Sequence, residues 1–110
     1  MSETQLFFDI DTLRTEQAAG GKAYLEFLRI PAMSAGVYAL RAGSEDQQSP
    51  HRQDELYYVV RGRARMKAGG EQDREVTVGS VIFVTANVEH RSYDISEDLL
   101  VLVFFAPAEN

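Results

Sequence analysis

Cysteine is absent from the 110-residue sequence, and histidine occurs only twice, as His51 and His90. Without cysteine the chain forms no disulfide scaffold, no zinc ribbon and no thiol nucleophile. Long apolar runs are also missing, because the longest, residues 99–107, is far too short to span a bilayer. The first residues show no basic region followed by an apolar core, so a signal peptide is not expected. We therefore expect a cytoplasmic protein with no membrane partner.

Basic side chains are outnumbered, with 11 Lys and Arg residues against 17 Asp and Glu residues and a formal net charge of −6. Proteins that bind a nucleic-acid duplex usually carry a clustered basic face, so no nucleic-acid partner is expected. The length suits one compact domain. The composition, with 45% apolar and 25% charged residues, is typical of an ordinary globular protein.

The chain begins with one expected helix and continues as short strands. The helix is predicted over residues 11–19, with Asp11 as its N-cap and Gly20 and Gly21 ending it. The apolar runs that follow are separated by turn residues, which is typical of strands. Strands are predicted at residues 23–30, 37–41, 55–60, 63–68, 75–78, 81–84, 91–93 and 99–105. Many short strands with little helix indicate an antiparallel sandwich or barrel, and the last run, apolar on both faces, should be buried on both sides.

Polar side chains that are costly to bury gather before and within the third predicted strand. Because alternate residues of a strand share a face, Ser49, His51, Gln53, Glu55 and Tyr57 should point the same way. Inside a barrel these groups need partners, so they either bond to one another or share a cation. The face turns apolar after Glu55, as expected for a site at a barrel mouth with a dry floor.

The second histidine lies on a later strand, where Val88, His90 and Ser92 share a face. If the two strand pairs are neighbours across a barrel, His90 can meet His51 and Glu55. Two imidazoles and one carboxylate with open positions form a site typical of non-haem iron(II), and also compatible with manganese, zinc, nickel or copper. A pair of hydrogen-bonded core histidines is the alternative interpretation.

The spacing of these residues resembles the first motif of the cupin superfamily. That motif is Gly, five residues, His-x-His, three or four residues, Glu, six residues and Gly. This chain has Gly43, five residues, Ser49-Pro50-His51, three residues, Glu55, six residues and Gly62. Every spacing matches, and Ser49 stands where the family has its first histidine.

A second stretch resembles the second cupin motif, which is Gly, five residues, Pro-x-Gly, two residues, His, three residues and Asn. Here Gly79 is followed by five residues, Thr85-Ala86-Asn87, two residues, His90, three residues and Asp94. Both histidines of the chain therefore occupy ligand positions of the motifs, while Thr85, Asn87 and Asp94 replace the usual Pro, Gly and Asn.

The resemblance implies an all-β double-stranded β-helix, or jelly-roll, barrel with one divalent transition metal inside. Residues 1–110 would be one cupin domain, with an N-terminal extension over 1–21 and the barrel over 22–107. Iron, manganese, nickel or zinc would be held by His51, Glu55 and His90. The resemblance also implies dioxygenase, isomerase or lyase chemistry on a small-molecule substrate. A non-catalytic protein that binds or senses a small molecule, with a degenerate metal site, is the alternative.

Two further side chains are candidate site residues. Gln53 can complete the metal coordination through its amide oxygen or orient a ligand or substrate by a hydrogen bond. Tyr57 can orient the substrate and donate a phenolic proton to it, although packing in the barrel is the alternative. Ser49 can hold a bound water in place of the family's first histidine. Arg52 and Arg91 fall on the opposite faces and should lie outside the barrel.

The start of the chain carries an apolar patch formed by Phe7, Phe8 and Ile10. These residues can either cover the barrel or pack against a partner subunit. Because single-domain cupins of this length are commonly dimers, the resemblance adds a homodimer to the expectations.

Overall fold

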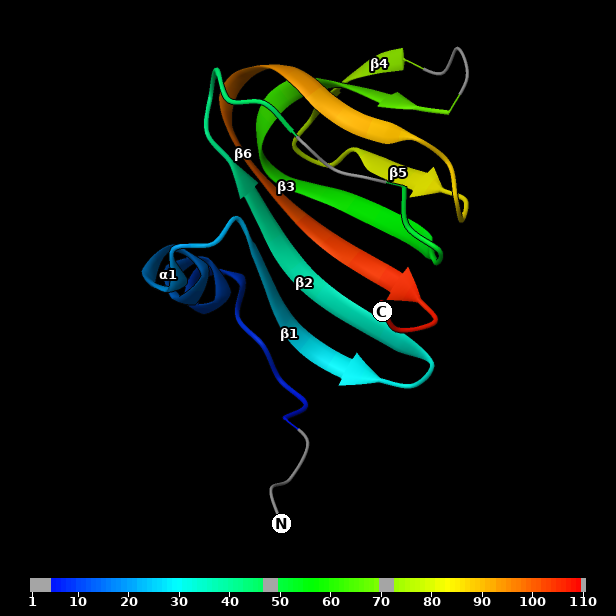
Figure 1. The fold of residues 1–110 in the computed structure, drawn as a ribbon. Helices are drawn as coiled ribbons and strands as arrows, with labels where there is room; N and C mark the ends of the chain where they lie inside the picture. The colour runs from blue at the N-terminus through cyan, green and yellow to red at the C-terminus, as the bar shows by residue number, and fades with distance from the viewer. Residues whose placement is uncertain (1–4, 47–49, 70–72, 110) are drawn as a thin grey trace.

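The computed structural model describes residues 5–46, 50–69 and 73–109, and these residues form one helix and six strands (Figure 1). The six strands make one antiparallel sheet in the order β1-β2-β6-β3-β4, and β5 also pairs with β3. The elements are α1 (Ile10–Gly20), β1 (Tyr24–Ile30), β2 (Met33–Leu40), β3 (Asp54–Ala68), β4 (Asp73–Thr77), β5 (Val81–Val84) and β6 (His90–Ala106).

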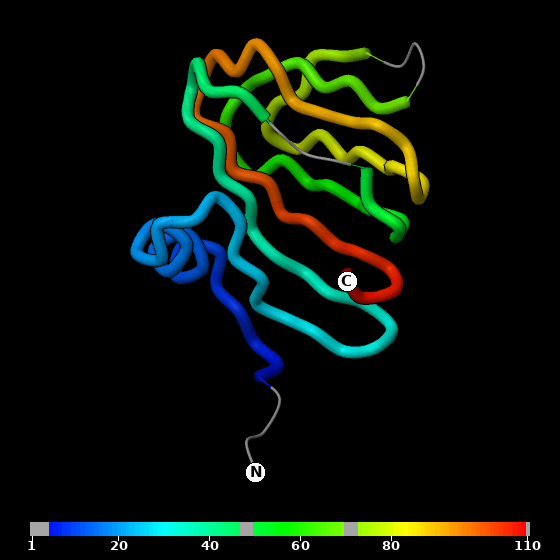
Figure 2. The backbone as a smooth tube through the Cα atoms, viewed as in Figure 1, coloured from blue at the N-terminus to red at the C-terminus, as the bar shows by residue number. Residues whose placement is uncertain are grey.

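The two longest strands, β3 and β6, bend so that the sheet folds over itself, as the ribbon and the backbone tube show (Figures 1 and 2). The first part of β3 pairs with β5 and the end of β6, so that Leu56 lies between Phe83 and Phe104. The second part pairs with β4 and the start of β6, so that Met66 lies between Arg74 and Ser92. The fold therefore has two strand layers with their inner faces toward one another.

The bends correct the prediction that residues 55–60 and 63–68, and residues 91–93 and 99–105, are separate strands. Each pair belongs to one continuous strand. The pairing of β3 with β6 shifts register between Val59 and Arg65, where Gly62 adopts φ +100°. A β-bulge bends a strand without ending it, and a glycine supplies the backbone angle that the bend needs.

Both faces of β6 are buried, as its apolar run predicts. Val101 and Val103 belong to the main core between the two layers. Leu100 belongs to a second cluster on the outer face, where it packs with Val37 of β2 and Leu13 of α1. The helix therefore covers the outer face of the sheet over β1 and β2.

The starts of α1 and β2 differ from their predictions for identifiable reasons. The helix has its N-cap at Asp9, whose side chain accepts a hydrogen bond from the Asp11 backbone N–H, and Asp11 lies within the first turn. Strand β2 begins at Met33, earlier than predicted, because Ser34 and its small neighbours pair with β6 although their side chains have low strand propensity. Within the described residues, no helix is both long and apolar enough to cross a membrane.

Candidate metal centre

The two motif segments are joined by backbone hydrogen bonds that bring both histidines to one place. His51 lies in the loop before β3, Glu55 near the start of β3, and His90 at the start of β6. The Asn87 N–H donates to the His51 carbonyl at 2.6 Å. The Ala86 N–H donates to the Asp54 carboxylate at 2.8 Å. The loop before β3 is therefore held against the turn that precedes His90.

The two imidazoles and the carboxylate converge. His51 Nε2 lies 3.3 Å from Glu55 Oε1, and His90 Nε2 lies 3.2 Å from Glu55 Oε2. One ligand atom from each of the three residues lies within 4.8 Å of the other two. Two ligands bound to one ion at about 2.1 Å, at tetrahedral or octahedral angles, are about 3.0–3.4 Å apart. The spacing therefore fits a shared divalent cation.

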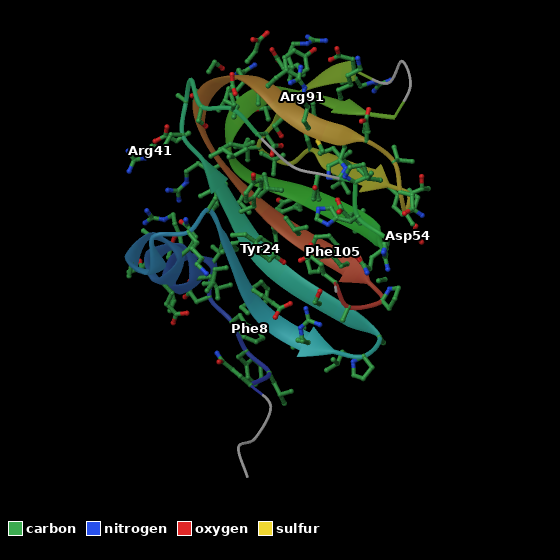
Figure 3. All side chains as sticks on the ribbon, in the orientation of Figure 1. Phe8, Tyr24, Arg41, Asp54, Arg91 and Phe105 are labelled. Atoms are coloured by element: carbon green, nitrogen blue, oxygen red, sulfur yellow. The ribbon has the colours of Figure 1, made fainter. Side chains whose placement is uncertain are left out.

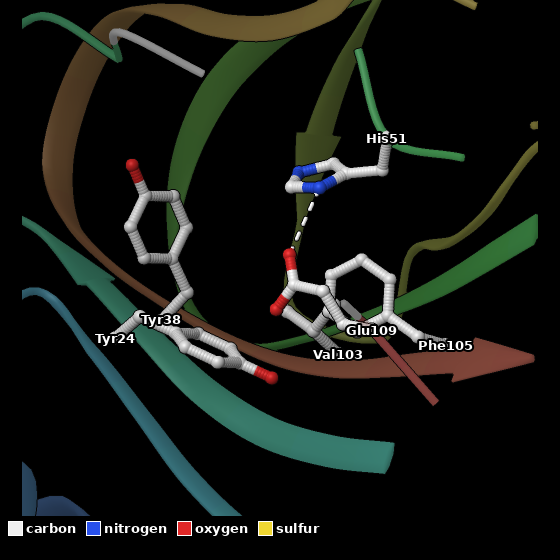
Figure 4. Close-up of a pocket in the computed structure, with 6 residues that line it drawn as sticks. All are labelled: Tyr24, Tyr38, His51, Val103, Phe105 and Glu109. Carbon is white, nitrogen blue, oxygen red and sulfur yellow. Dashed lines mark ion pairs between the residues drawn. The ribbon is translucent and has the colours of Figure 1, made fainter. Parts of the chain in front are cut away.

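The hydrogen bonds of the rings leave both Nε2 lone pairs facing Glu55. His90 Nδ1 lies 3.1 Å from the Val88 carbonyl, which can only accept, so Nδ1 carries the proton. His51 Nδ1 lies 2.9 Å from Glu109 Oε2 and likewise donates (Figure 4). A neutral imidazole that donates from Nδ1 offers a lone pair at Nε2, which is the atom that a metal binds.

The atoms at the centre of the cluster lack ordinary partners. Glu55 is 2% exposed and His90 is 5% exposed. Neither carboxylate oxygen of Glu55 nor Nε2 of His90 makes a hydrogen bond of acceptable geometry to the described part of the chain. Buried acceptors that face one another repel unless a proton or a cation lies between them. The donor set thus fits a metal ion better than a hydrogen-bonded pair of core histidines.

Burial disfavours charge on two of these groups. Burial raises the pKa of the Glu55 carboxyl, against the lowering influence of the Tyr57 hydroxyl and the two imidazoles. Burial also lowers the pKa of His51, which keeps that ring neutral and its lone pair available. A bound cation would instead stabilise the charged form of Glu55.

A cavity of about 190 Å³ lies beside the cluster (Figure 4). Its lining consists of Tyr24, Tyr38, His51, Val103, Phe105 and Glu109. A second void of about 10 Å³, lined mostly by apolar side chains, shares Tyr38 with this cavity. The site therefore opens on one side to a small aromatic-walled chamber, which suits a small organic molecule.

The two tyrosines of the cavity differ in their hydrogen bonding. The Tyr38 hydroxyl donates to Asp46, whose other oxygen accepts from the Ser92 N–H. The Tyr24 hydroxyl is buried and has no hydrogen-bond partner among the described residues. Burial and the nearby Glu109 carboxylate raise the Tyr24 pKa, so this hydroxyl stays protonated and can donate to a bound molecule.

The structure brings His51, Glu55 and His90 together as the sequence predicts, whereas the other candidates lie apart from the cavity lining. Gln53 is buried immediately before β3, and its role as a ligand or orienting group stays a prediction. Tyr57 is buried deeper, with its ring centroid 5.7 Å from that of His90, and its part in catalysis also stays a prediction.

Three further residues were assigned positions from the sequence: Ser49, Arg52 and Arg91. Ser49 lies outside the described residues. Arg52 and Arg91 are exposed, as predicted, and Figure 3 shows Arg91 at the periphery of the molecule. The sequence analysis did not identify Glu109 as a site residue. It belongs to no motif and to no predicted strand, so its position beside His51 is visible only in the structure.

Comparison with known proteins identifies relatives over most of the chain. The cupin domain family matches residues 36–105. An uncharacterized protein of Streptomyces coelicolor is 52% identical over 103 residues, which cover 94% of this chain and 97% of that protein.

Solved structures show the same fold at lower identity. TT1209 from Thermus thermophilus has a TM-score of 0.73 at 21% identity, covering 93% of this chain and 97% of that one. The DMSP lyase DddQ from Ruegeria pomeroyi has a TM-score of 0.69 at 18% identity over 81% of this chain. The match covers 49% of DddQ, so this chain spans about half the length of that lyase. A cupin family protein with a double-stranded β-helix fold from Methanocaldococcus jannaschii has a TM-score of 0.68 at 14% identity, covering 76% of this chain and 78% of that one, and this likeness confirms the predicted double-stranded β-helix.

Proposed function

This chain belongs to the cupin domain family, and from that membership we propose that it is a metal-dependent enzyme acting on a small molecule held in its barrel. One observation carries the proposal. His51 Nε2 and His90 Nε2 lie 3.3 Å and 3.2 Å from the Glu55 carboxylate, and the two carboxylate oxygens and His90 Nε2 are buried without a hydrogen bond of acceptable geometry to the described part of the chain. A buried arrangement of this kind is costly unless the groups share a cation.

His51, Glu55 and His90 would hold the ion, with iron, manganese, nickel and zinc as the candidates. When bound, such an ion supplies Lewis-acid polarisation of a substrate oxygen and, in the case of iron, redox chemistry. Three protein ligands would leave coordination positions free for a substrate, and one of the three, His51, also lines the cavity.

The side chains that line the cavity would bind the substrate and exclude water from it. Tyr24, which stays protonated, donates a hydrogen bond to the substrate. The rings of Tyr38 and Phe105 pack against its apolar body and exclude water. The Tyr57 hydroxyl lies near the Glu55 carboxylate and favours its charged form, which is the form that binds a cation. The cavity volume of about 190 Å³ limits the substrate to a small molecule.

A screen of the metal-loaded protein tests the proposal. Iron- and manganese-loaded samples are incubated with catechols, thiols and diketones, and oxygen consumption and product formation are measured. We expect turnover of at least one class, abolished by chelator and by His90→Ala. Arg91→Ala, which changes an exposed neighbour of His90, is the matched control and should retain activity.

A non-catalytic binding or sensing protein is the second candidate. One observation favours it: Ser49 stands where the family motif has a further histidine, so the metal has one imidazole fewer. Tight binding of a small molecule by the metal-loaded protein, with no turnover of that molecule, would support this candidate over the enzyme.

A further inference from the structure

Glu109 contacts the proposed metal centre from a direction that the family motifs do not include. Its Oε2 atom lies 2.9 Å from His51 Nδ1 (Figure 4). The other nitrogen of that ring, Nε2, is the one that lies 3.3 Å from Glu55. The sequence separation is 109 − 51 = 58 positions, so folding alone brings the two groups together. The Glu109 side chain is 23% exposed, so its carboxyl group lies largely out of solvent.

The segment that carries Glu109 is anchored on both sides. Its backbone N–H donates to the hydroxyl of Ser34, a fully buried residue of β2, at 2.9 Å. Its carbonyl accepts from Arg29 Nη2 at 2.5 Å, and the Ala108 N–H donates to the Pro31 carbonyl at 3.3 Å. Figure 2 shows the chain returning beside the turn between β1 and β2. These bonds aim the Glu109 side chain at the cavity.

The two metal-site histidines are oriented by different means. His90 belongs to β6, and its Nδ1 bonds to the carbonyl of Val88, two residues earlier, so its own segment fixes its ring. His51 lies in a loop outside any strand, and its Nδ1 bonds to the carboxylate of a distant residue. A carboxylate accepts a stronger hydrogen bond than a carbonyl and increases the basicity of the ligand nitrogen across the ring.

We propose that Glu109 is a positioning residue that sets the tautomer and the ring orientation of His51, and thereby the metal affinity of the site. The inference rests on the proposed metal centre. Glu109 is not itself placed as a ligand, because the converging group is formed by His51, Glu55 and His90 and the carboxylate of Glu109 bonds to the opposite ring nitrogen.

Cobalt(II) binding to the chelator-treated full-length protein tests the effect on affinity. The dissociation constant is measured by calorimetry and the ligand field by the visible spectrum. Loss of such an orienting partner typically weakens metal binding about 10–100-fold, and we expect this for Glu109→Ala together with a shifted spectrum. Glu109→Gln should recover most of the loss, because its amide oxygen still accepts from Nδ1. The control Glu97→Ala removes an exposed carboxylate that pairs with Arg63 and should change neither quantity.

The imidazole nitrogen resonances of His51 supply a readout that needs no metal. In the wild-type protein, ¹⁵N correlation spectra at pH 8 should show the proton on Nδ1, and Glu109→Ala should lose this preference while His90 keeps it. Wild-type affinity in Glu109→Ala, or an equal loss in Glu109→Gln, would overturn the inference. If the wild-type protein binds no cobalt, the metal centre itself is wrong and the tautomer result alone decides the role of Glu109.

Discussion

Glu55 is the residue on which the chemistry of the site depends. Its side chain is buried among two imidazoles whose Nδ1 protons are committed elsewhere, so neither ring donates to it from Nε2 in the neutral state. Burial therefore raises its pKa. In the metal-free site burial shifts this carboxyl group toward its protonated form, and a bound cation would instead stabilise its charged form.

The substitution Glu55→Gln should raise the stability of the metal-free protein and weaken its metal binding. The folded-state pKa of Glu55 lies above its ordinary value of 4.5, so its contribution to stability is fully present below that value and is lost as the pH rises through the folded-state pKa. Glutamine does not titrate, and its amide can donate to an Nε2 lone pair. We expect the metal-free variant to be about 1–3 kcal/mol more stable than the wild type at pH 8, with a smaller difference at pH 5.

Chemical unfolding in the presence of chelator measures this difference, and the same variant should bind metal far more weakly than the wild type. A variant that is less stable at pH 8, or a stability difference that does not grow with pH, would contradict the account of Glu55.

Individual residues also show which features of the site could be predicted from the sequence. The motif spacing predicts that His51, Glu55 and His90 meet, and the structure brings them together. Asn87 replaces the glycine of the second motif, and its φ of +64° shows that asparagine takes the left-handed backbone which that position needs. Glu109 was not predictable, because its contact depends on how the end of the chain packs beside the β1–β2 turn.

Among the elements, β3 and β6 determine where the site lies. Gly62 in the middle of β3 and the polar residues in the middle of β6 suggested that each strand ends there, yet cross-strand pairing resumes beyond them with a shifted register. Gly62 shows the reason. It has φ +100°, and a Cβ atom at this position would overlap the backbone carbonyl of Asp98 on β6. Local propensity predicts a turn at such a residue, whereas the partner strand decides whether pairing resumes beyond it.

Gly62→Ala should destabilise the protein more than Gly79→Ala. Both glycines have positive φ, of +100° and +91°, so both substitutions carry the conformational cost of about 1–3 kcal/mol. Only Gly62 also faces backbone at overlapping distance, since nothing lies within 4 Å of a Cβ atom at Gly79. Thermal and denaturant unfolding of the two variants measure the difference. Equal losses would show that the close approach of β3 and β6 at Gly62 is unimportant.

For the molecule as a whole, the motifs predict the double-stranded β-helix and the structure confirms it, but the surface was less predictable. The predicted apolar patch at the start of the chain divides in two. Phe8 and Ile10 pack on the outer sheet face, whereas Phe7 is 87% exposed. The sequence could not show which of these three residues would be buried, because all three are apolar and their burial depends on how the start of the chain packs on the sheet.

The homodimer stays a prediction, and the structure suggests which face would form it. The outer face of β3 and β5 carries two cross-strand apolar pairs, Leu56 with Phe83 and Tyr58 with Val81, which are 41–61% exposed. Exposed apolar patches of this kind mark interfaces, and a two-fold dimer would bury the same patch on both subunits. Light scattering coupled to gel filtration should show a dimer for the wild type and a monomer for Phe83→Asp. Ile30→Asp, on the far strand β1, should stay dimeric, and a monomeric wild type would refute the prediction.

Metal analysis of protein purified without added metal tests the central claim most directly. We predict about one divalent transition-metal ion per chain in the wild type and in Arg52→Ala, which alters an exposed neighbour of His51. His51→Ala and His90→Ala should each lose the ion, because either substitution removes one of the three converging ligands. A metal content that is unchanged in both histidine variants would contradict the proposed centre.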